Sequence, residues 1–166
     1  ERGMMPISLP GMGVYQCQDG HVVAYVMAPG GADFTELVAW MREEGMAGDL
    51  DEPEYVELIG NLNMATLTQY MINPDLAKDV IPRLMHINEL VKAFFAAKGA
   101  TEAYEQGQGR RLLIGLVSTP KDLAENRQLR ARDWYRSIDL GPLGRSIEFP
   151  GPPYRLAETP AVVGRP

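Results

Sequence analysis

The sequence contains a single cysteine, Cys17, and only two histidines, His21 and His86. One cysteine cannot form a disulfide within the chain, and we expect a reducing, cytoplasmic location. Two isolated histidines without a cluster of cysteines or carboxylates argue against a metal site. No Ser–His–Asp arrangement can be argued either. Cys17, which lacks a catalytic partner, is expected to pack as a small apolar side chain.

Long apolar runs and an excess of basic residues are also lacking. No apolar run approaches the roughly 20 residues that a membrane-spanning helix needs. Acidic residues outnumber basic residues by 22 to 16, so the net charge is −6 and the pI is near 4.9. This balance argues against nucleic acids and anionic membranes as partners. Across 166 residues, 45% apolar and 23% charged residues are typical of a soluble globular chain.

Two glycine pairs were compared with phosphate-binding loops. Gly107-x-Gly109 precedes two arginines, and Gly30-Gly31 precedes an expected helix. A helix N-terminus can receive an anion, but neither pair matches a Walker or dinucleotide fingerprint. Turn formation is the simpler interpretation of both.

The first part of the chain predicts a β-hairpin followed by helices. Val14–Ala28 is rich in valine and tyrosine, and Asp19-Gly20 fits a two-residue type I′ turn. Asp33, with Glu36 three residues later, predicts a helix start. An apolar face follows at helical spacing, and Gly45 suits the helix end. The residues of that face are Phe34, Leu37, Val38 and Met41.

The longest periodic stretch, residues 75–98, predicts the main helix. Pro82 lies inside it, and we place the helix start near Val80 because proline suits a first turn. Short helices are expected at Glu54–Ile59 and Thr101–Gln108, whereas Asn61–Asn73 could be a helix or a packed loop.

The last third predicts a strand, a helix and further strands. Leu112–Val117 is typical of a buried strand, which must pair with a segment far away in sequence. Thr119 as the N-cap, Pro120 at the first helical position and Asp122 three residues after the cap predict a helix start. We expect a short helix that stops at Asn126. Leu129–Arg132 is then interpreted as leading into a second strand. Two further short strands, residues 136–140 and residues 146–149, are expected on either side of a turn at residues 141–144.

Several motifs in one order carry a family resemblance. Glu102-Ala103-Tyr104 precedes the strand, VSTPKDL occupies Val117–Leu123, and QLRAR occupies Gln128–Arg132. Tyr15 and Asp19-Gly20 form a Tyr–x–x–x–Asp-Gly hairpin before them, and Gly144, Pro150-Gly151-Pro152-Pro153 and Thr159-Pro160 follow. Together these motifs resemble the class III CoA-transferases, a family that includes carnitine, bile-acid and formyl CoA-transferases and the α-methylacyl-CoA racemases.

The resemblance implies an α+β fold. A small antiparallel sheet covered by helices would be followed by a strand–helix–strand segment that returns, in the family, to a large domain. Residues 1–13 would be an interdomain loop, residues 14–109 the small domain, and residues 110–166 the returning segment. A large N-terminal domain is then expected to be missing from this chain, and the whole protein is expected to form an interlocked homodimer.

The implied activity belongs to that whole protein. An acyl-CoA and a carboxylic acid would exchange CoA through an aspartyl-CoA thioester in the missing N-terminal domain. Coenzyme A would enter as a substrate thioester, with no covalently bound cofactor. This chain would contain no catalytic residue and would be inactive alone. The alternatives are a fragment of an α-methylacyl-CoA racemase-like isomerase, a separate subunit that assembles with the missing part, and a stand-alone non-catalytic binding or scaffold protein.

Substrate-binding residues are implied at Gly11, Met12 and Gly13. In formyl-CoA-transferase-like members, a glycine-rich segment just before the hairpin closes over the active site. Glycine permits close backbone approach and methionine provides adaptable apolar contact. An ordinary interdomain loop is the alternative. Arg130 and Arg132 could grip a phosphate or carboxylate, although the resemblance favours Arg132 as a structural anchor between segments.

Overall fold

The computed structural model describes residues 9–26, 34–141, 144–154 and 156–161. The chain divides into two compact units, residues 1–117 and residues 118–166, which we describe separately. Within the described ranges, no helix is both long and apolar enough to cross a membrane.

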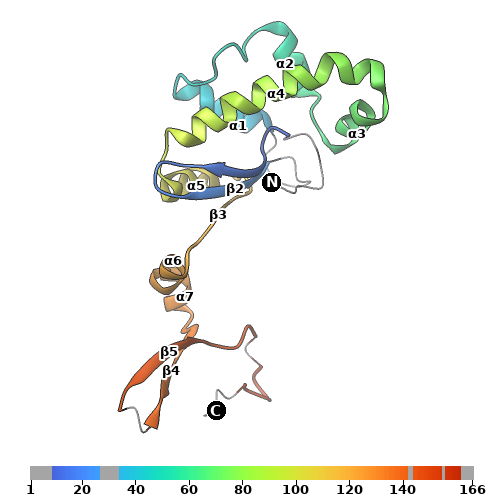
Figure 1. Ribbon diagram of the computed structural model, residues 1–166. Coiled ribbons are helices and arrows are strands. Elements are labelled where there is room, and N and C mark those ends of the chain that lie inside the picture. Colours follow the sequence, from blue (N-terminus) through green and yellow to red (C-terminus); the bar gives the residue numbers. More distant parts are fainter. Residues whose placement is uncertain (1–8, 27–33, 142–143, 155, 162–166) are drawn as a thin grey trace. The chain divides into compact units, whose positions relative to one another are not determined.

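A three-stranded antiparallel sheet organises the first unit (Figure 1). Strand β1 (Met12–Gln16) pairs with β2 (His21–Tyr25), and β2 also pairs with β3 (Ile114–Leu116). The expected pairing of the late strand with a distant segment is therefore confirmed. However, β3 is an edge strand, because β2 occupies the centre of the sheet. One face of β3 is also exposed rather than buried.

The hairpin turn differs from the expected type I′ turn. Gln16 pairs with His21, and the Cys17 N–H donates to the Gly20 carbonyl at 2.8 Å, so Gln18 and Asp19 are the central residues. Neither Asp19 nor Gly20 has a positive φ. Tertiary contacts decide this geometry. The Gln18 N–H donates to the Lys98 carbonyl at 2.8 Å, and an Asp19 carboxylate oxygen accepts from the Ala100 N–H at 2.6 Å.

Three helices follow the hairpin. Helix α1 (Phe34–Glu43) buries the expected apolar face, and Gly45, at φ +69°, ends it as expected. Asp33 and Gly30-Gly31 lie outside the described residues. Helix α2 (Pro53–Gly60) forms as expected, and the ambiguous stretch contains α3 (Met64–Ile72), which is capped by the Asn63 side chain.

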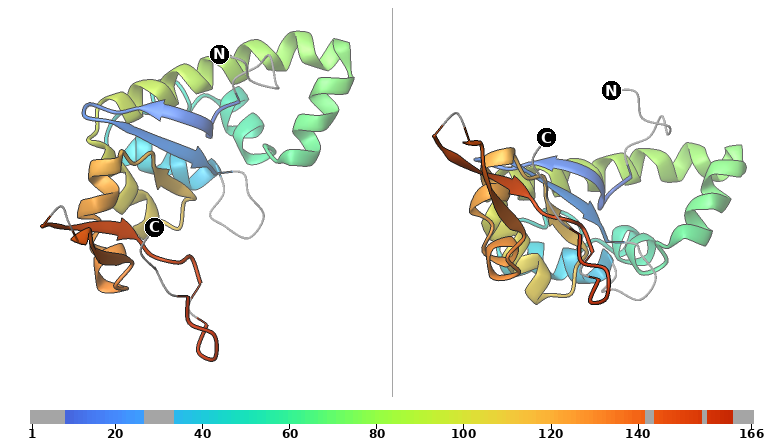
Figure 2. Two further views of the ribbon diagram at one scale, coloured as in Figure 1. Left: turned by 60° about the horizontal axis from the view of Figure 1, so that its bottom comes forward. Right: turned by 90° about the horizontal axis from the view of Figure 1, so that it is seen from below.

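Helix α4 (Pro74–Ala96) is longer than expected. Asn73 accepts hydrogen bonds from the backbone N–H groups of residues 75 and 76, and Pro74 occupies the first turn. The helix therefore begins before Val80, and Pro82 lies inside it, on an exposed part of its surface. Helix α5 (Ala100–Gly109) follows directly, and Figure 2 shows α4 running along the hairpin.

The described core of the protein lies entirely in the first unit. The inner face of the sheet packs against α1, α4 and α5, with four aromatic rings at the centre. The Trp40 and Phe94 rings meet edge to face at 4.8 Å, and the Tyr15 and Phe95 rings lie 5.0 Å apart. Cys17 is buried here, and burial raises the pKa of its thiol.

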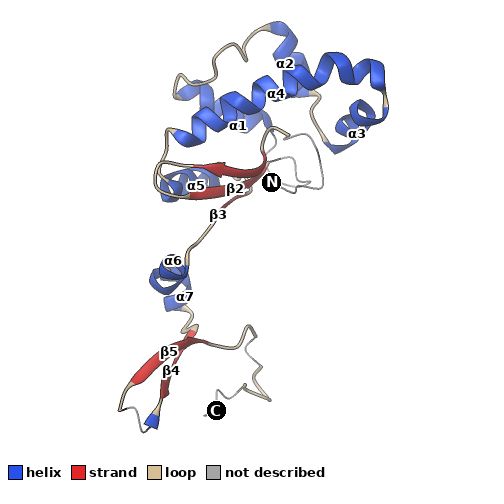
Figure 3. Cartoon of the chain, in the orientation of Figure 1, coloured by secondary structure: helices blue, strands red, loops and turns tan. Residues whose placement is uncertain are grey.

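The second unit contains two short helices and a hairpin (Figure 3). Helix α6 (Pro120–Glu125) has the expected Thr119–Asp122 capping box and stops at Asn126. Helix α7 (Arg127–Ala131) replaces the strand approach expected at residues 129–132, because the Asn126 side chain caps a new helical turn. Strands β4 (Tyr135–Asp139) and β5 (Ser146–Pro150) then pair antiparallel, close to their expected ranges.

The observed architecture is the expected α+β class, with small antiparallel sheets and helices. Strand β3 belongs to the first unit, which runs through Val117, and β1 already begins at Met12. The division of the chain at residues 13 and 109 into loop, small domain and returning segment stays a prediction about the whole protein.

Candidate functional site: the segment before the hairpin and the arginines of the second unit

Gly11 occupies a tight position directly before β1. Its φ is +69°, and an added Cβ would overlap Val26 Cγ2 and lie 3.0 Å from the Phe34 ring. The Gly11 carbonyl also accepts from the Val26 N–H at 3.0 Å. Only glycine combines this backbone conformation with so close an approach. The structure therefore gives Gly11 a packing role of its own.

A buried tyrosine holds this segment to the longest helix. The Gly11 N–H donates to the Tyr15 hydroxyl at 2.7 Å. The hydroxyl oxygen lies 2.9 Å from Asn88 Oδ1 in α4 and 3.4 Å from the Leu9 carbonyl oxygen. Burial raises the pKa of Tyr15 to about 12, so the hydroxyl is neutral and can donate at neutral pH. Sequence reasoning missed Asn88. Its signal was a polar residue inside the apolar face of the main helix, next to Ile87 and four residues after Leu84.

Met12 and Gly13 differ from Gly11 in exposure. The Met12 side chain is partly buried against the core, whereas Gly13 is exposed, with a φ of +145° and open space where a Cβ would be. Gly13 pairs with Ala24 in the β1–β2 ladder, but its Cβ side is open, so of the three it is the residue that another molecule could approach. Substrate contact by Gly11, Met12 and Gly13 stays a prediction.

Arg130 is committed to the structure of the second unit. Its Nη1 atom lies 2.8 and 2.9 Å from the two carboxylate oxygens of Glu148, and its Nε atom donates to the Ala124 carbonyl at 2.8 Å. Its guanidinium also lies over the Tyr135 ring at 4.5 Å. The ion pair lowers the pKa of the Glu148 carboxyl. Because these contacts join α7 to β5, the suggested grip of Arg130 on a phosphate or carboxylate would require breaking them.

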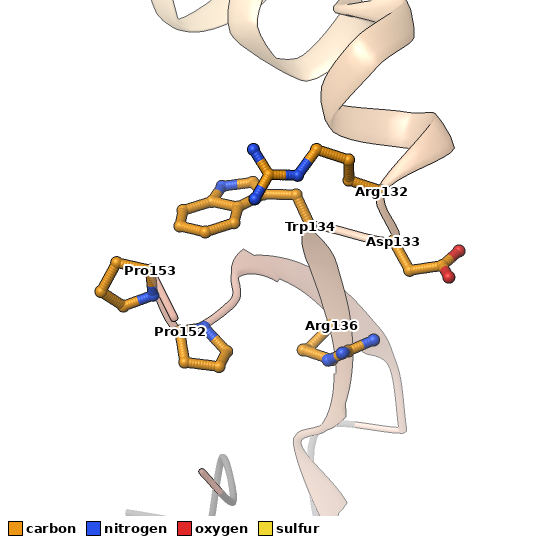
Figure 4. Close-up of a pocket in the computed structure, with 6 residues that line it drawn as sticks. All are labelled: Arg132, Asp133, Trp134, Arg136, Pro152 and Pro153. Atoms are coloured by element: carbon orange, nitrogen blue, oxygen red, sulfur yellow. The ribbon is translucent and has the colours of Figure 1, made fainter. Parts of the chain in front are cut away.

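Arg132 lines a small cavity of about 20 Å³, enough for one water molecule (Figure 4). The cavity is lined by Arg132, Asp133, Trp134, Arg136, Pro152 and Pro153. The Pro150–Pro153 segment crosses Trp134 closely, because the Gly151 N–H donates to the Trp134 carbonyl at 2.7 Å and a Cβ on Gly151 would overlap that oxygen. Arg132 thus lies where two segments of the chain meet, as a structural anchor would.

The glycines before the late strand serve packing. A Cβ on Gly107 would lie 2.6 Å from Ile114 Cδ1, so this glycine lets α5 approach β3. Arg110 is ion-paired with Glu36 and Glu43 and lies over the Trp40 ring. This arginine is therefore engaged within the first unit. Gly107 and Gly109 themselves lie in the last turns of α5, so the expectation of a turn at this glycine pair was wrong.

A buried lysine joins the end of α4 to α1. Lys98 Nζ lies 2.5 Å from Glu44 Oε2 and about 5 Å above the Trp40 and Phe94 rings. The Trp40 Nε1 group donates to the other Glu44 oxygen at 2.5 Å. Every buried side-chain nitrogen and oxygen of the described residues has a hydrogen-bond partner. This network is therefore closed and offers no free group to a ligand.

Neither histidine forms part of a metal or catalytic cluster in the described residues. His21 is exposed at the start of β2, and His86 Nε2 lies 2.7 Å from Asp49 Oδ1, which lowers the pKa of Asp49. Among the residues that the structure describes, no group of three or more histidine, cysteine, aspartate or glutamate side chains could hold a metal ion.

An open hollow between α2, α3 and α4 was not anticipated from the sequence. Its volume is about 180 Å³, and it is lined by Glu54, Glu57, Leu58, Asn61, Tyr70, Val80 and Arg83. Arg83 is already bound to Asp79 at 2.8 Å. The hollow therefore presents mixed charges and no arranged set of reactive groups.

The described residues thus contain an open surface at Gly13 and arginines engaged in internal contacts, and their buried polar side-chain atoms all have hydrogen-bond partners. The model of the family described as CoA-transferase family III matches residues 2–166. The chain therefore belongs to CoA-transferase family III, whose members use CoA thioesters as substrates.

Individual relatives are distant. The chain is 23% identical, over 155 residues, to succinyl-CoA:(R)-benzylsuccinate CoA-transferase subunit BbsE of Thauera aromatica, and the match covers 92% of this chain and 34% of that protein. Two crystal structures of Rv3272 from Mycobacterium tuberculosis share the fold. Their TM-scores are 0.51 and 0.53, with 18% and 16% identity, and they cover 93% and 94% of this chain. The chain spans 36% of Rv3272 and hence about a third of the length of these relatives.

Proposed function

We propose that this chain is the C-terminal part of a CoA-transferase that moves CoA between two carboxylic acids. The observation that carries the proposal is the family match over residues 2–166 in a chain that spans only 34% of BbsE. BbsE is named as a subunit of a CoA-transferase, which favours transfer over racemisation for the present protein.

The proposed chemistry uses an aspartate of the N-terminal part. Its carboxylate attacks the thioester carbonyl of the acyl-CoA, which forms an acyl-aspartyl anhydride and releases CoA thiolate. The thiolate then attacks the aspartyl carbonyl, which releases the first acid and leaves an aspartyl-CoA thioester. The carboxylate of the acceptor acid reverses these two steps and leaves as the new acyl-CoA, so the aspartate is regenerated.

The aspartates of this chain support a nucleophile that lies elsewhere. Asp19 binds the N-terminus of α5, Asp49 binds His86, and the Asp122 carboxylate accepts from the Thr119 N–H in the capping box of α6. The other described aspartates also interact with other groups of the chain. They are Asp51, Asp75, Asp79, Asp133 and Asp139. A nucleophile needs a free carboxylate beside its substrate, and these carboxylates are engaged in folding.

In this proposal the present chain shapes the acyl side of the site. Gly13, exposed and with open space on its Cβ side, would contact the acyl group together with Met12, and Gly11 would hold both in place. The whole protein would work as an interlocked homodimer in the cytoplasm. The naming of BbsE as a subunit is consistent with an oligomeric enzyme.

The test is a CoA-transfer assay on the family-length protein. Succinyl-CoA would be mixed with a panel of free acids that includes (R)-benzylsuccinate, and new acyl-CoA would be identified by mass spectrometry. We expect transfer by the family-length protein and none by the 166-residue chain. Replacing the upstream aspartate by asparagine should lower turnover by at least about a thousandfold, whereas Asp51→Asn, at an exposed ion pair with Arg42, should leave it nearly unchanged.

Three results would contradict the proposal. Transfer by the pure 166-residue chain would place the nucleophile within it. Exchange of the α-proton of an acyl-CoA, without transfer, would favour the racemase alternative. An immunoblot of the source cells that shows a native band at 18.4 kDa would exclude a single family-length polypeptide.

A further inference from the structure

One face of the first unit's sheet is apolar, and the other described residues of that unit do not cover it. Neighbouring residues of a strand point to opposite faces. Val22 and Ala24 are fully buried, whereas Val23 between them is exposed. On the same side as Val23 lie further apolar side chains that are between 39% and 64% exposed. We call this set the outer sheet face, and it consists of Val14, Val23, Tyr25, Leu113 and Val117.

The three strands that carry these residues lie side by side in the order β1, β2, β3 (Figure 2). Val14 is directly opposite Val23 in the register of β1 and β2, and Val23 is opposite Gly115 of β3. The Tyr25 N–H donates to the Leu113 carbonyl at 2.9 Å, and the Val117 N–H donates to the His21 carbonyl at 3.0 Å. The five side chains therefore form one continuous patch.

The composition of this face is that of a buried surface. An antiparallel sheet with one face in water normally places polar residues on that face. Here polar residues occur only at the hairpin end, where Gln16 is opposite His21. A contiguous apolar patch of this kind marks an interaction surface. Because the five side chains carry no charge, the surface that covers them must itself be apolar.

We propose that the outer sheet face is covered by the part of the same polypeptide that lies upstream of residue 1. This inference rests on the proposed function. The chain spans 34% of BbsE and 36% of Rv3272, so roughly two thirds of a family member's length lies outside it. The first described residue is Leu9, three residues before β1, so the upstream polypeptide would lead into this sheet. An apolar surface of the upstream part would pack on Val14, Val23 and their neighbours.

Cysteine labelling of the family-length protein tests this proposal. Val23→Cys places a thiol on the outer sheet face, and Val56→Cys on α2 provides a matched position, since the two valines are 42% and 47% exposed. Each variant would be made in the 166-residue chain and in the family-length protein. Maleimide labelling would be followed peptide by peptide with mass spectrometry, and the buried native Cys17 would report any unfolding.

In the 166-residue chain, both new thiols should react at similar rates. In the family-length protein, the Val23→Cys thiol should react at least about tenfold more slowly, while the Val56→Cys rate should not change, because labelling requires solvent access. Equal rates in the family-length protein would overturn the proposal. Protection that disappears when a dimer is diluted to monomers would also overturn it, since a second copy would then be the cover.

This readout is separate from the activity assay. Protection of the Val23→Cys thiol in a protein without CoA transfer would support the covered face and refute the proposed activity. Transfer in a protein whose Val23→Cys thiol stays accessible would refute the covered face alone.

Discussion

The hydroxyl of Tyr15 connects the segment before β1 to α4, and this contact depends on single atoms. The hydroxyl accepts from Gly11 and lies 2.9 Å from Asn88 Oδ1. A phenylalanine at this position would leave the Gly11 N–H and the Asn88 oxygen without this partner, and unpaired buried polar groups cost free energy. At the residue scale, the position of Gly11 is therefore set by the side chain of Tyr15, four residues later, and by that of Asn88, 73 residues after Tyr15.

Alkaline pH should destabilise the protein through Tyr15. Its pKa is raised from 10.0 to about 12 by burial, so the folded state keeps a proton that the unfolded state loses. The stabilisation is fully present below about pH 10 and is lost as the pH rises through about 12, with a total of roughly 2–3 kcal/mol. Urea unfolding between about pH 9 and pH 12 would measure this loss. Tyr15→Phe should be less stable at neutral pH but should show a smaller loss at high pH, and an unchanged slope would contradict this account.

At the scale of elements, the hairpin tip and the N-terminus of α5 depend on each other. Helix α5 has Gly99 as its N-cap residue, which has no side chain to bind the free N–H groups of the first turn. Asp19, from the tip of the β1–β2 hairpin, supplies the missing oxygen to the Ala100 N–H at 2.6 Å. A negative charge at a helix N-terminus is also favourable because of the helix dipole. The turn thus adopts the geometry that presents Asp19 to α5.

Removing that carboxylate should uncouple the two elements. We expect Asp19→Ala to lower the free energy of unfolding by about 1 kcal/mol, as the loss of an N-cap side chain does. Asp19→Asn should lose less, because its amide oxygen can still accept the hydrogen bond. Asp51→Ala, at an exposed pair with Arg42, should change stability by no more than about 0.5 kcal/mol. Equal effects of Asp19→Ala and Asp51→Ala in urea unfolding would show that Asp19 does not act as a cap.

The whole molecule is asymmetric in its core. All described apolar side chains that are buried lie between Leu9 and Ile114, in the first unit. In the described part of the second unit, α6 and α7 have no buried residue, and Leu123, Phe149, Tyr154 and Leu156 are exposed. A two-stranded hairpin is at best marginally stable by itself. We therefore expect residues 118–166 to be at best marginally stable by themselves.

Truncation should separate the two units. A chain of residues 1–117 should keep its helical circular dichroism and unfold cooperatively on heating, because it contains the whole described core. A chain of residues 118–166 should show no cooperative transition. A cooperative transition in residues 118–166, or its absence in residues 1–117, would contradict this division. The second case would mean that the core of the first unit needs the C-terminal residues.

Local patterns were sufficient for many elements. The face of α1, the capping box of α6 and the glycine after α1 were predicted because each depends on residues within one or two turns. The start of α4 was predicted too late, although Asn73 and Pro74 are a typical start, because Pro82 suggested a later one. Helix α7 was missed for a similar reason, since the capping signal of Asn126 was interpreted only as the end of α6.

The sequence by itself determined the α+β class and the membership of CoA-transferase family III, because both depend on local periodicity and on the order of short motifs. Tertiary structure alone decided that β3 is an edge strand, that Tyr15 binds Asn88 and that Asp19 caps α5. It also placed the apolar residues of the outer sheet face together, where the other described residues of the first unit do not cover them. Each of these features joins residues that are about 70 or more positions apart, and such pairings are set by packing of the whole chain, which local propensity does not encode.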